Sequence, residues 1–94
     1  MEITIQFTGI AKSITRQNEL VLNIPQGSTY RDILKILAAR FPGLIGLLIA
    51  SDGESFLSSN MFVINGDLIY PAMIMENSPS AGEHISLMSV ITGG

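Results

Sequence analysis

Alternating apolar and polar residues mark two strands in the first quarter of the chain. Ile3, Ile5 and Phe7 alternate with polar neighbours, and this period of two predicts a strand with one buried face. The alternation returns over residues 20–24 and ends at the turn-forming run of residues 25–27. A polar connection joins the two strands, so we expect them to form a long hairpin.

An amphipathic helix is predicted next, from about residue 29 to residue 40. Either Ser28 or Thr29 can cap its N-terminus, and Asp32 places a carboxylate in the first turn, where the helix dipole is positive. Apolar residues recur at spacings of three and four, which predicts a stripe packed on a sheet. The stripe consists of Tyr30, Ile33, Leu34, Leu37, Ala38 and Phe41. Pro42-Gly43 ends the pattern.

The middle of the chain predicts a second, tighter hairpin. Residues 44–50 form a short apolar run that fits either a second helix or a buried strand, because periodicity does not separate the two at this length. Asn65-Gly66 follows a strand-like run and favours a two-residue hairpin turn, since both residues tolerate positive φ. We therefore expect a hairpin around residues 61–69, followed by a long connection over residues 70–82.

The strand-like run of residues 83–92 predicts the final strand. Side chains alternate along a strand, so Ile85 and Leu87 should point toward the helix and their neighbours toward the opposite face. Exposed apolar side chains on that face, methionine above all, favour contact with a partner. The residues expected to form this partner surface are Met61, Val63, Met88 and Val90.

Composition limits the classes of function. The chain of 94 residues is expected to form one domain, residues 1–94, with a single core. A net charge of −3 with only five Lys and Arg residues disfavours nucleic-acid binding, because no basic stripe can neutralise phosphates. The sequence has no cysteine, which excludes disulfides, thiolate catalysis and the usual zinc patterns.

No membrane segment is expected from the sequence. The longest apolar run, residues 44–50, is far below the roughly 20 residues that span a bilayer. Glu2 follows Met1 directly, which is unlike a signal peptide. We therefore expect a cytoplasmic protein that has neither membrane nor nucleic acid as a partner.

The terminal pair Gly93-Gly94 is the candidate site of chemistry. Glycines lack a Cβ atom, so such a tail can enter a narrow active site and adopt dihedrals closed to other residues. A terminal carboxylate is ionised at neutral pH, with a reference pKa of roughly 3.3–3.7, and is therefore a poor electrophile. A partner must activate it. The alternative is a frayed end without function.

The order of these elements resembles the β-grasp of ubiquitin-like proteins, and more closely the MoaD/ThiS family of sulfur carriers, nearest to the small subunit of molybdopterin synthase. The resemblance implies an α+β fold with a mixed five-stranded sheet, the first strand parallel to the last, and one main helix packed on one face. The segments that carry it are Ile3 to Phe7, residues 28–34, Phe41-Pro42, residues 63–67, residues 81–83 and Gly93-Gly94.

The resemblance implies a carrier protein that is not itself an enzyme. A ubiquitin-activating-type adenylyltransferase would use ATP to adenylate Gly94, which would then become a thiocarboxylate, while Thr92 and Gly93 would be held in the partner's channel. The chain itself would bind no cofactor, in keeping with its lack of a Gly-rich phosphate loop. A sulfur donor and a large synthase subunit or other acceptor enzyme would be the remaining partners.

Three functional hypotheses follow from the resemblance. The first is sulfur carriage for molybdopterin synthesis, with thiamin synthesis or tRNA thiolation as the next candidate pathways. The second is a protein modifier, in which activated Gly94 forms an amide with a lysine. The third is a β-grasp interaction module without tail chemistry, since a fold alone does not determine a function.

Overall fold

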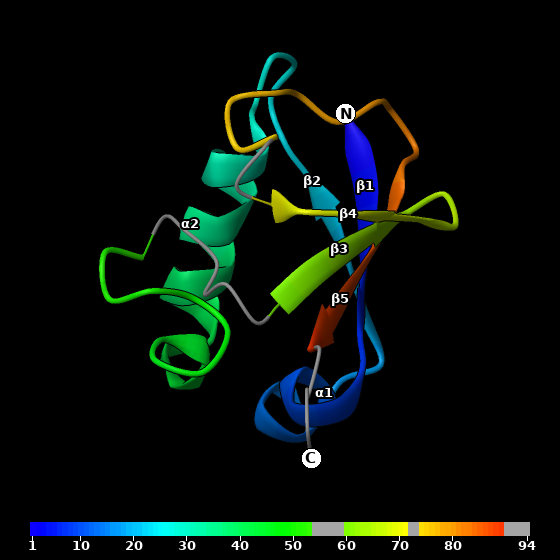
Figure 1. Cartoon of the computed structure of the whole chain (residues 1–94). Coiled ribbons are helices and arrows are strands. Elements are labelled where there is room, and N and C mark those ends of the chain that lie inside the picture. Colours follow the sequence, from blue (N-terminus) through cyan, green and yellow to red (C-terminus); the bar gives the residue numbers. More distant parts are fainter. Residues whose placement is uncertain (54–59, 72–73, 90–94) are drawn as a thin grey trace.

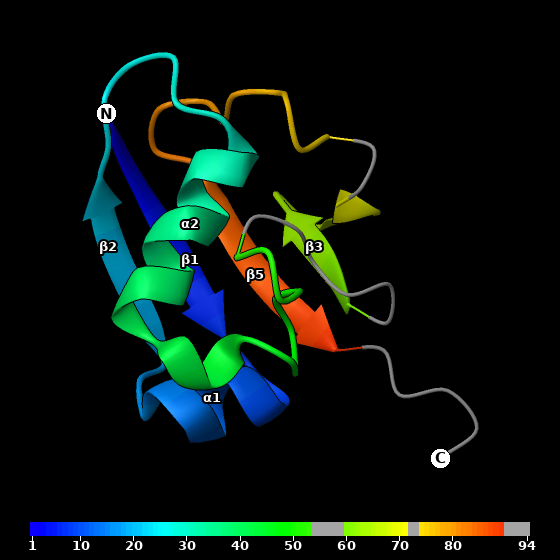
Figure 2. The ribbon, with the colours of Figure 1, turned by 90° about the vertical axis from the view of Figure 1, so that its left-hand side faces the viewer.

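The structure is a computed structural model that describes residues 1–53, 60–71 and 74–89 (Figures 1 and 2). Over these residues five strands, two α-helices and one short 3-10 helix make an α+β arrangement, as predicted. The elements are β1 (Glu2–Phe7), α1 (Gly9–Thr15), β2 (Glu19–Asn23), α2 (Tyr30–Arg40), the 3-10 helix η1 (Pro42–Leu44), β3 (Asn60–Ile64), β4 (Asp67–Ile69) and β5 (His84–Ser89). Among the described helices, none is long and apolar enough to cross a membrane.

The five strands form one mixed sheet in the order β2-β1-β5-β3-β4. The last strand therefore lies at the centre, between the first strand and β3. β1 and β5 are parallel, with Ile5 opposite Ile85 and Phe7 opposite Leu87. All other neighbouring pairs are antiparallel. The predicted mixed sheet, with the first strand parallel to the last, is confirmed.

Helix α2 covers one face of this sheet (Figure 2) and closes the core. Every other residue of β1 is buried, as the period of two predicted, and so are Ile85 and Leu87 of β5. From the helix side, Leu34 and Leu37 are completely buried. The ring of Phe41, which caps the helix, is half-buried and packs edge-on against Phe7 at 5.7 Å between centroids. The predicted stripe is confirmed.

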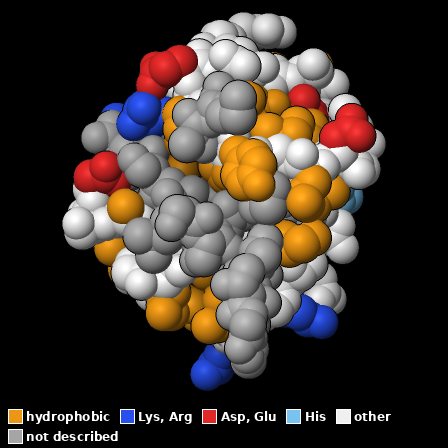
Figure 3. Space-filling model, in the orientation of Figure 1, with side chains coloured by type: hydrophobic (Ala, Val, Ile, Leu, Met, Phe, Trp, Pro, Cys, Tyr) orange, Lys and Arg blue, Asp and Glu red, His pale blue; other side chains and the backbone are white. Residues whose placement is uncertain are grey.

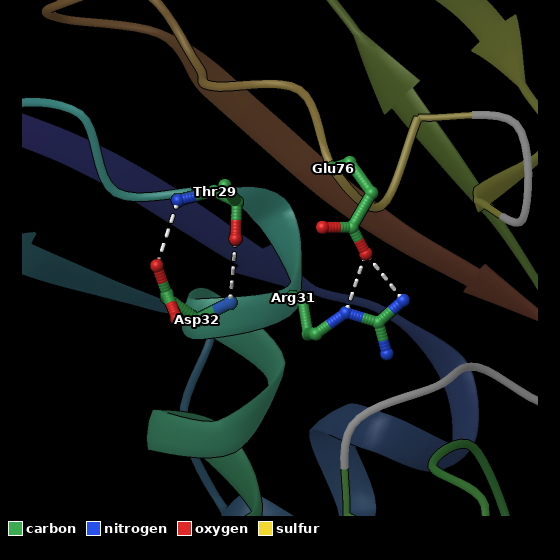
Figure 4. Close-up of polar contacts among 4 residues, drawn as sticks. All are labelled: Thr29, Arg31, Asp32 and Glu76. Atoms are coloured by element: carbon green, nitrogen blue, oxygen red, sulfur yellow. Dashed lines mark hydrogen bonds and ion pairs between the residues drawn. The ribbon is translucent and has the colours of Figure 1, made fainter.

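A capping box begins α2 at Thr29 (Figure 4). The hydroxyl of Thr29 accepts a hydrogen bond from the backbone N–H of Asp32 at 3.2 Å, and the Asp32 carboxylate accepts one from the N–H of Thr29 at 3.0 Å. Two N–H groups that a helix start leaves without partners are thus bonded. The hydrogen bond from the Thr29 backbone also holds the pKa of Asp32 below its ordinary value.

The long connection after β4 lies against the start of α2. The backbone N–H of Tyr30 donates to the carbonyl of Asn77 at 2.9 Å, and that of Arg31 donates to the carbonyl of Met75 at 3.0 Å. In addition to these backbone bonds, the guanidinium of Arg31 forms an ion pair with the carboxylate of Glu76 at 2.6 Å (Figure 4). The ion pair is exposed and contributes little, whereas the backbone bonds provide partners for the remaining first-turn donors of the helix.

The predicted pairing of the first two strands is confirmed, but the connection between them contains a helix that was not predicted. Ala11 and Thr15 of α1 are buried, four residues apart on one helical face. The Thr15 hydroxyl donates back to the Ala11 carbonyl at 2.9 Å, which satisfies it inside the core. The helix ends at Arg16, whose φ of 59° is left-handed. Its two buried residues are one small and one polar, and Ile14 packs half-buried beside them, so the apolar spacing was too short to predict the helix.

The apolar run that fitted either a helix or a strand is neither. It continues from η1 as turns, and the described residues show only an isolated bridge between Ile45 and Ile49. Gly46 has a φ of +94°, which interrupts both regular structures. The run still fills the core, because Leu44 and Leu48 are almost fully buried. The apolar side chains of the run therefore pack in the core, although its backbone forms neither an α-helix nor a strand.

The tight hairpin at Asn65-Gly66 is confirmed. Both residues have positive φ, 51° and 89°, which matches the mirror-image turn that fits the twist of paired strands. The two-residue turn sets the register of β3 and β4, with Val63 opposite Leu68.

We predict that Leu37→Ala lowers the free energy of unfolding by about 2–5 kcal/mol, because it removes transfer energy and leaves a cavity between helix and sheet. Urea denaturation measures this loss. Lys35→Ala, on the exposed side of the same helix, serves as the control and should change stability by less than about 0.5 kcal/mol. Equal effects of the two substitutions would contradict the assignment of Leu37 to the core.

Candidate functional site

The sheet face that points away from α2 divides into a polar half and an apolar half. Alternation brings mainly polar side chains to this face on β1, β2 and the first part of β5; they are Glu2, Thr4, Gln6, Glu19, Asn23, His84 and Ser86. Over β3, β4 and the end of β5 the side chains are apolar (Figure 3). We call this second group the apolar patch; its described side chains are Val63, Leu68, Tyr70 and Met88.

Strand register brings the apolar patch together. Val63 lies opposite Leu68 on β4 and opposite Ser86 on β5. One step along, the backbone of Met61 lies opposite Met88. Tyr70 directly follows β4, two positions after Leu68, where alternation returns to the same face. Leu68 is 56% exposed, Tyr70 62% and Met88 37%, so large apolar groups gather here in contact with solvent.

The predicted partner-surface residues are placed only in part. Val63 and Met88 lie on the predicted face, and Val63 is half-buried. The backbone of Met61 lies in the same row as Met88, but its side chain is outside what the structure describes. Val90 also lies outside the described residues. The partner surface therefore stays a prediction.

Leu68 and Tyr70 were missed by the sequence reasoning. Their signal was available, because a two-residue turn at Asn65-Gly66 places residue 63 opposite residue 68, and alternation then assigns residue 70 to the same face. The hairpin was recognised in the sequence, but its register was not carried across to the second strand.

The predicted tail residues, Thr92, Gly93 and Gly94, lie outside the described residues. The structure describes the chain up to Ser89, which ends β5 beside the start of β3. Five further residues carry the chain to Gly94, and five residues span at most about 18 Å. Any partner that reacts with Gly94 therefore works within that distance of the end of β5, and so close to the apolar patch.

Side chains of the polar half interact with one another. The side-chain oxygen of Gln6 accepts a hydrogen bond from the Ser86 hydroxyl at 3.3 Å and lies 2.9 Å from Nε2 of His84. The single histidine thus belongs to a hydrogen-bonded cluster across β1 and β5. The described residues contain no group of three or more metal-ligating side chains.

A buried polar pair fixes the start of β5. Glu83 is only 8% exposed. One carboxylate oxygen accepts a hydrogen bond from the Tyr30 hydroxyl at 2.5 Å, and the other accepts one from the Ser80 N–H at 3.2 Å. The backbone carbonyl of Glu83 accepts from Thr4 of β1 at 3.0 Å. One residue therefore ties the sheet centre to the start of α2.

Burial raises the pKa of the Tyr30 hydroxyl well above its ordinary value, and the hydrogen bond to Glu83 and the negative charge of that carboxylate raise it further. The neutral phenol is thus favoured in the folded state. Its stabilising effect is fully present below the unfolded-state pKa of about 10 and is lost as the pH rises above that value. Sequence reasoning did not find this pair, because the partners are 53 positions apart.

We predict that Tyr30→Phe lowers the unfolding free energy at neutral pH by about 1–3 kcal/mol, since the Glu83 carboxylate loses a donor while remaining buried. Above about pH 10 the parent should lose stability more steeply than the variant, by up to about 1.4 kcal/mol per pH unit. Urea denaturation of both proteins between about pH 8 and 11 measures the difference. Parallel stability curves would contradict the raised pKa.

Comparisons with known proteins agree with this fold. A sequence model of the ThiS family matches residues 5–94. SAMP1 from Haloferax volcanii is 17% identical, with 100% of both chains covered and a TM-score of 0.81. A putative molybdopterin converting factor, subunit 1, from Pyrococcus furiosus is 11% identical, with 96% of this chain and 98% of that chain covered and a TM-score of 0.74.

A third structure, a chain of the BexX/CysO complex from Amycolatopsis orientalis, is 16% identical, with 98% of this chain and 99% of that chain covered and a TM-score of 0.70. Likeness at such low identity shows the fold alone, and it confirms the expected β-grasp. None of the curated protein sequences matches the chain significantly.

Proposed function

The chain belongs to the ThiS family, and from that premise we propose that it carries sulfur on the carboxyl group of Gly94. Membership places the chain among the β-grasp sulfur carriers and ubiquitin-like modifiers. The observation that carries the proposal is the family match, which extends over Gly93-Gly94. The β-grasp topology supports it, because β5 at the sheet centre leads toward that pair.

The proposed chemistry takes place at the carbonyl carbon of Gly94. A carboxylate oxygen attacks the α-phosphorus of ATP, pyrophosphate leaves, and an acyl adenylate forms. Hydrosulfide supplied by the donor then attacks the carbonyl carbon, AMP leaves, and a thiocarboxylate remains. Adenylation is needed because an ionised carboxylate is a poor electrophile, and splitting the reaction in two makes each step easier. ATP, its binding site and the sulfur donor belong to partners.

The apolar patch is the proposed docking surface for these partners. Its exposed leucine, tyrosine and methionine side chains provide the type of apolar anchor that dominates protein interfaces. The patch lies within the reach of the tail from Ser89. An adenylyltransferase that binds the patch would therefore also receive Thr92 and Gly93 in its channel, with Gly94 at the reacting position.

Molybdopterin synthesis is the pathway we propose first, with a large synthase subunit as acceptor. The likeness to a putative molybdopterin converting factor subunit supports it at the level of fold. Sulfur transfer in thiamin synthesis or tRNA thiolation uses the same end-group chemistry and differs only in the acceptor. An acceptor test separates them: the thiocarboxylated protein is mixed with each candidate acceptor enzyme and its sulfur-free substrate, and loss of the thiocarboxylate identifies the pathway.

A protein modifier is the second candidate function. The structural likeness to SAMP1, whose name stands for small archaeal modifier protein 1, favours it. The first step is the same, but a lysine amine attacks the activated Gly94 and an amide forms. Mass spectrometry distinguishes the two outcomes. Replacement of one oxygen by sulfur in the free protein supports the carrier, and Gly94 joined to lysines of other proteins supports the modifier.

We predict that, in a chain ending at Gly94, deleting Gly94 or adding one alanine after it abolishes pyrophosphate exchange with the activating enzyme, because the reacting carbon moves out of position. Gly93→Val should have the same effect, since its Cβ fills the space that a narrow channel leaves for glycine. Unfolding midpoints should equal the parent's. A deletion variant with full pathway activity would show that the protein is an interaction module.

We further predict that Met88→Glu weakens binding of the activating enzyme by about 1 kcal/mol or more, because it places a charge in the apolar patch beside the root of the tail. Val21→Glu is the matched control: Val21 is 52% exposed on the same sheet face, but on edge strand β2. Calorimetric titration of both variants measures the effect. Comparable losses of affinity in the two variants would place the docking surface elsewhere.

A further inference from the structure

Helix α1 lies at the end of the sheet from which the chain leaves β5 (Figures 1 and 2). The hydroxyl of Thr8, directly before the helix, donates a hydrogen bond to the carbonyl of Leu87 at 2.8 Å. Leu87 is two residues from the end of β5. The helix is thus fixed to the strand that leads toward Gly94.

The exposed side of α1 and the residue that ends the helix carry positive charge, and no described carboxylate forms an ion pair with it. Lys12 and Arg16 are exposed, and neither forms an ion pair with a described carboxylate. The helix itself contains no acidic residue. The guanidinium of Arg31, by contrast, is paired with Glu76 at 2.6 Å. In a chain of net charge −3, two of the five cations therefore lie at the end of the sheet without an ion pair to a described carboxylate.

The reach of the tail places α1 inside the area that a partner must cover. Gly94 is at most about 18 Å from Ser89. A standard protein interface buries about 800 Å² on each side, a disc of roughly 16 Å radius. An enzyme that encloses Gly94 and also contacts the apolar patch covers the end of β5, and α1 is bonded to that end.

We propose that Lys12 and Arg16 form a second contact with the adenylating partner, on a carboxylate-rich rim beside the channel that receives the tail. This inference rests on the proposed carrier function and names the chemistry of its partner. Lys12 lies on the exposed side of α1, and the exposed Arg16 directly follows the last residue of the helix, so both cations lie at the same end of the sheet. Charges at the rim of an interface mainly accelerate association and fix orientation, and salt weakens their effect.

The proposed contact requires positive charges at this end of the sheet, whatever the net charge of the chain. An acidic rim repels a chain of net charge −3 unless its positive end approaches first. The double variant Lys12→Glu/Arg16→Glu reverses the charge of that end. Lys35→Glu/Arg40→Glu reverses two exposed cations of α2 and is the matched control, because each pair of exchanges takes the net charge from −3 to −7.

The experiment measures association rates by surface plasmon resonance, with the immobilised adenylyltransferase that supports pyrophosphate exchange with the parent chain. At low ionic strength we expect the α1 variant to associate about tenfold more slowly than the α2 control. Raising the salt to about 0.5 M should bring the two rates together, since the Debye length falls to roughly 4 Å. Unfolding midpoints of both variants verify that each is folded.

Two results would overturn the inference, and they differ. If the parent supports exchange but the two variants associate at equal rates at every salt concentration, the contact through α1 is wrong and the carrier function stands. If the parent supports no exchange with any adenylyltransferase of its own cell, the carrier function fails and this contact fails with it.

Discussion

The structure depends on the insertion of the last strand between two hairpins. β1 pairs with β2 and β3 pairs with β4 through local connections, and an isolated two-stranded hairpin is marginally stable in water. β5 pairs with β1 on one side and β3 on the other, which joins the hairpins into one sheet and brings Ile85 and Leu87 under α2. Without β5, no strand pairing would join the two hairpins into one sheet.

The start of α2 holds the segment that leads into this strand. Its first two N–H groups bond carbonyls of the connection at Asn77 and Met75, and Tyr30 donates to the buried carboxylate of Glu83. A buried carboxylate is costly unless it is hydrogen-bonded, so Glu83 favours the one arrangement in which Tyr30 and the Ser80 N–H both reach it. The beginning of β5 is therefore fixed by polar contacts, and its middle by apolar packing.

The sequence predicted the parts of the fold that arise from local patterns. Alternation identified the strands, the spacing of three and four residues identified α2, and Asn65-Gly66 identified the hairpin. It did not predict α1, whose buried face consists of Ala11 and Thr15, or the turns after Pro42, because their stability comes from packing against distant residues. The Tyr30–Glu83 pair could not be predicted from local patterns either, because its two residues are 53 positions apart.

For the candidate site, too, local patterns predicted some residues and not others. Alternation placed Met88 on the outer face, and the structure places it there, but Leu68 required the hairpin register to be carried across the turn. The role proposed for Gly94 rests on family membership, because the tail lies outside the described residues. The sequence did not identify Lys12 and Arg16 as part of a site, because only the structure shows that α1 lies beside the end of β5.

A central last strand suits a carrier for a geometric reason. Pairing with β3 holds β5 up to Ser89, so the point from which the tail starts has a fixed position relative to the apolar patch. Once a partner binds that patch, Gly94 is confined to within about 18 Å of a defined point, and its reaction becomes effectively intramolecular. Affinity and reactivity are then supplied by different parts of the chain. In the proposed function, the apolar patch provides the affinity for each partner, and Gly93-Gly94 fits a narrow active site because it has no side chains.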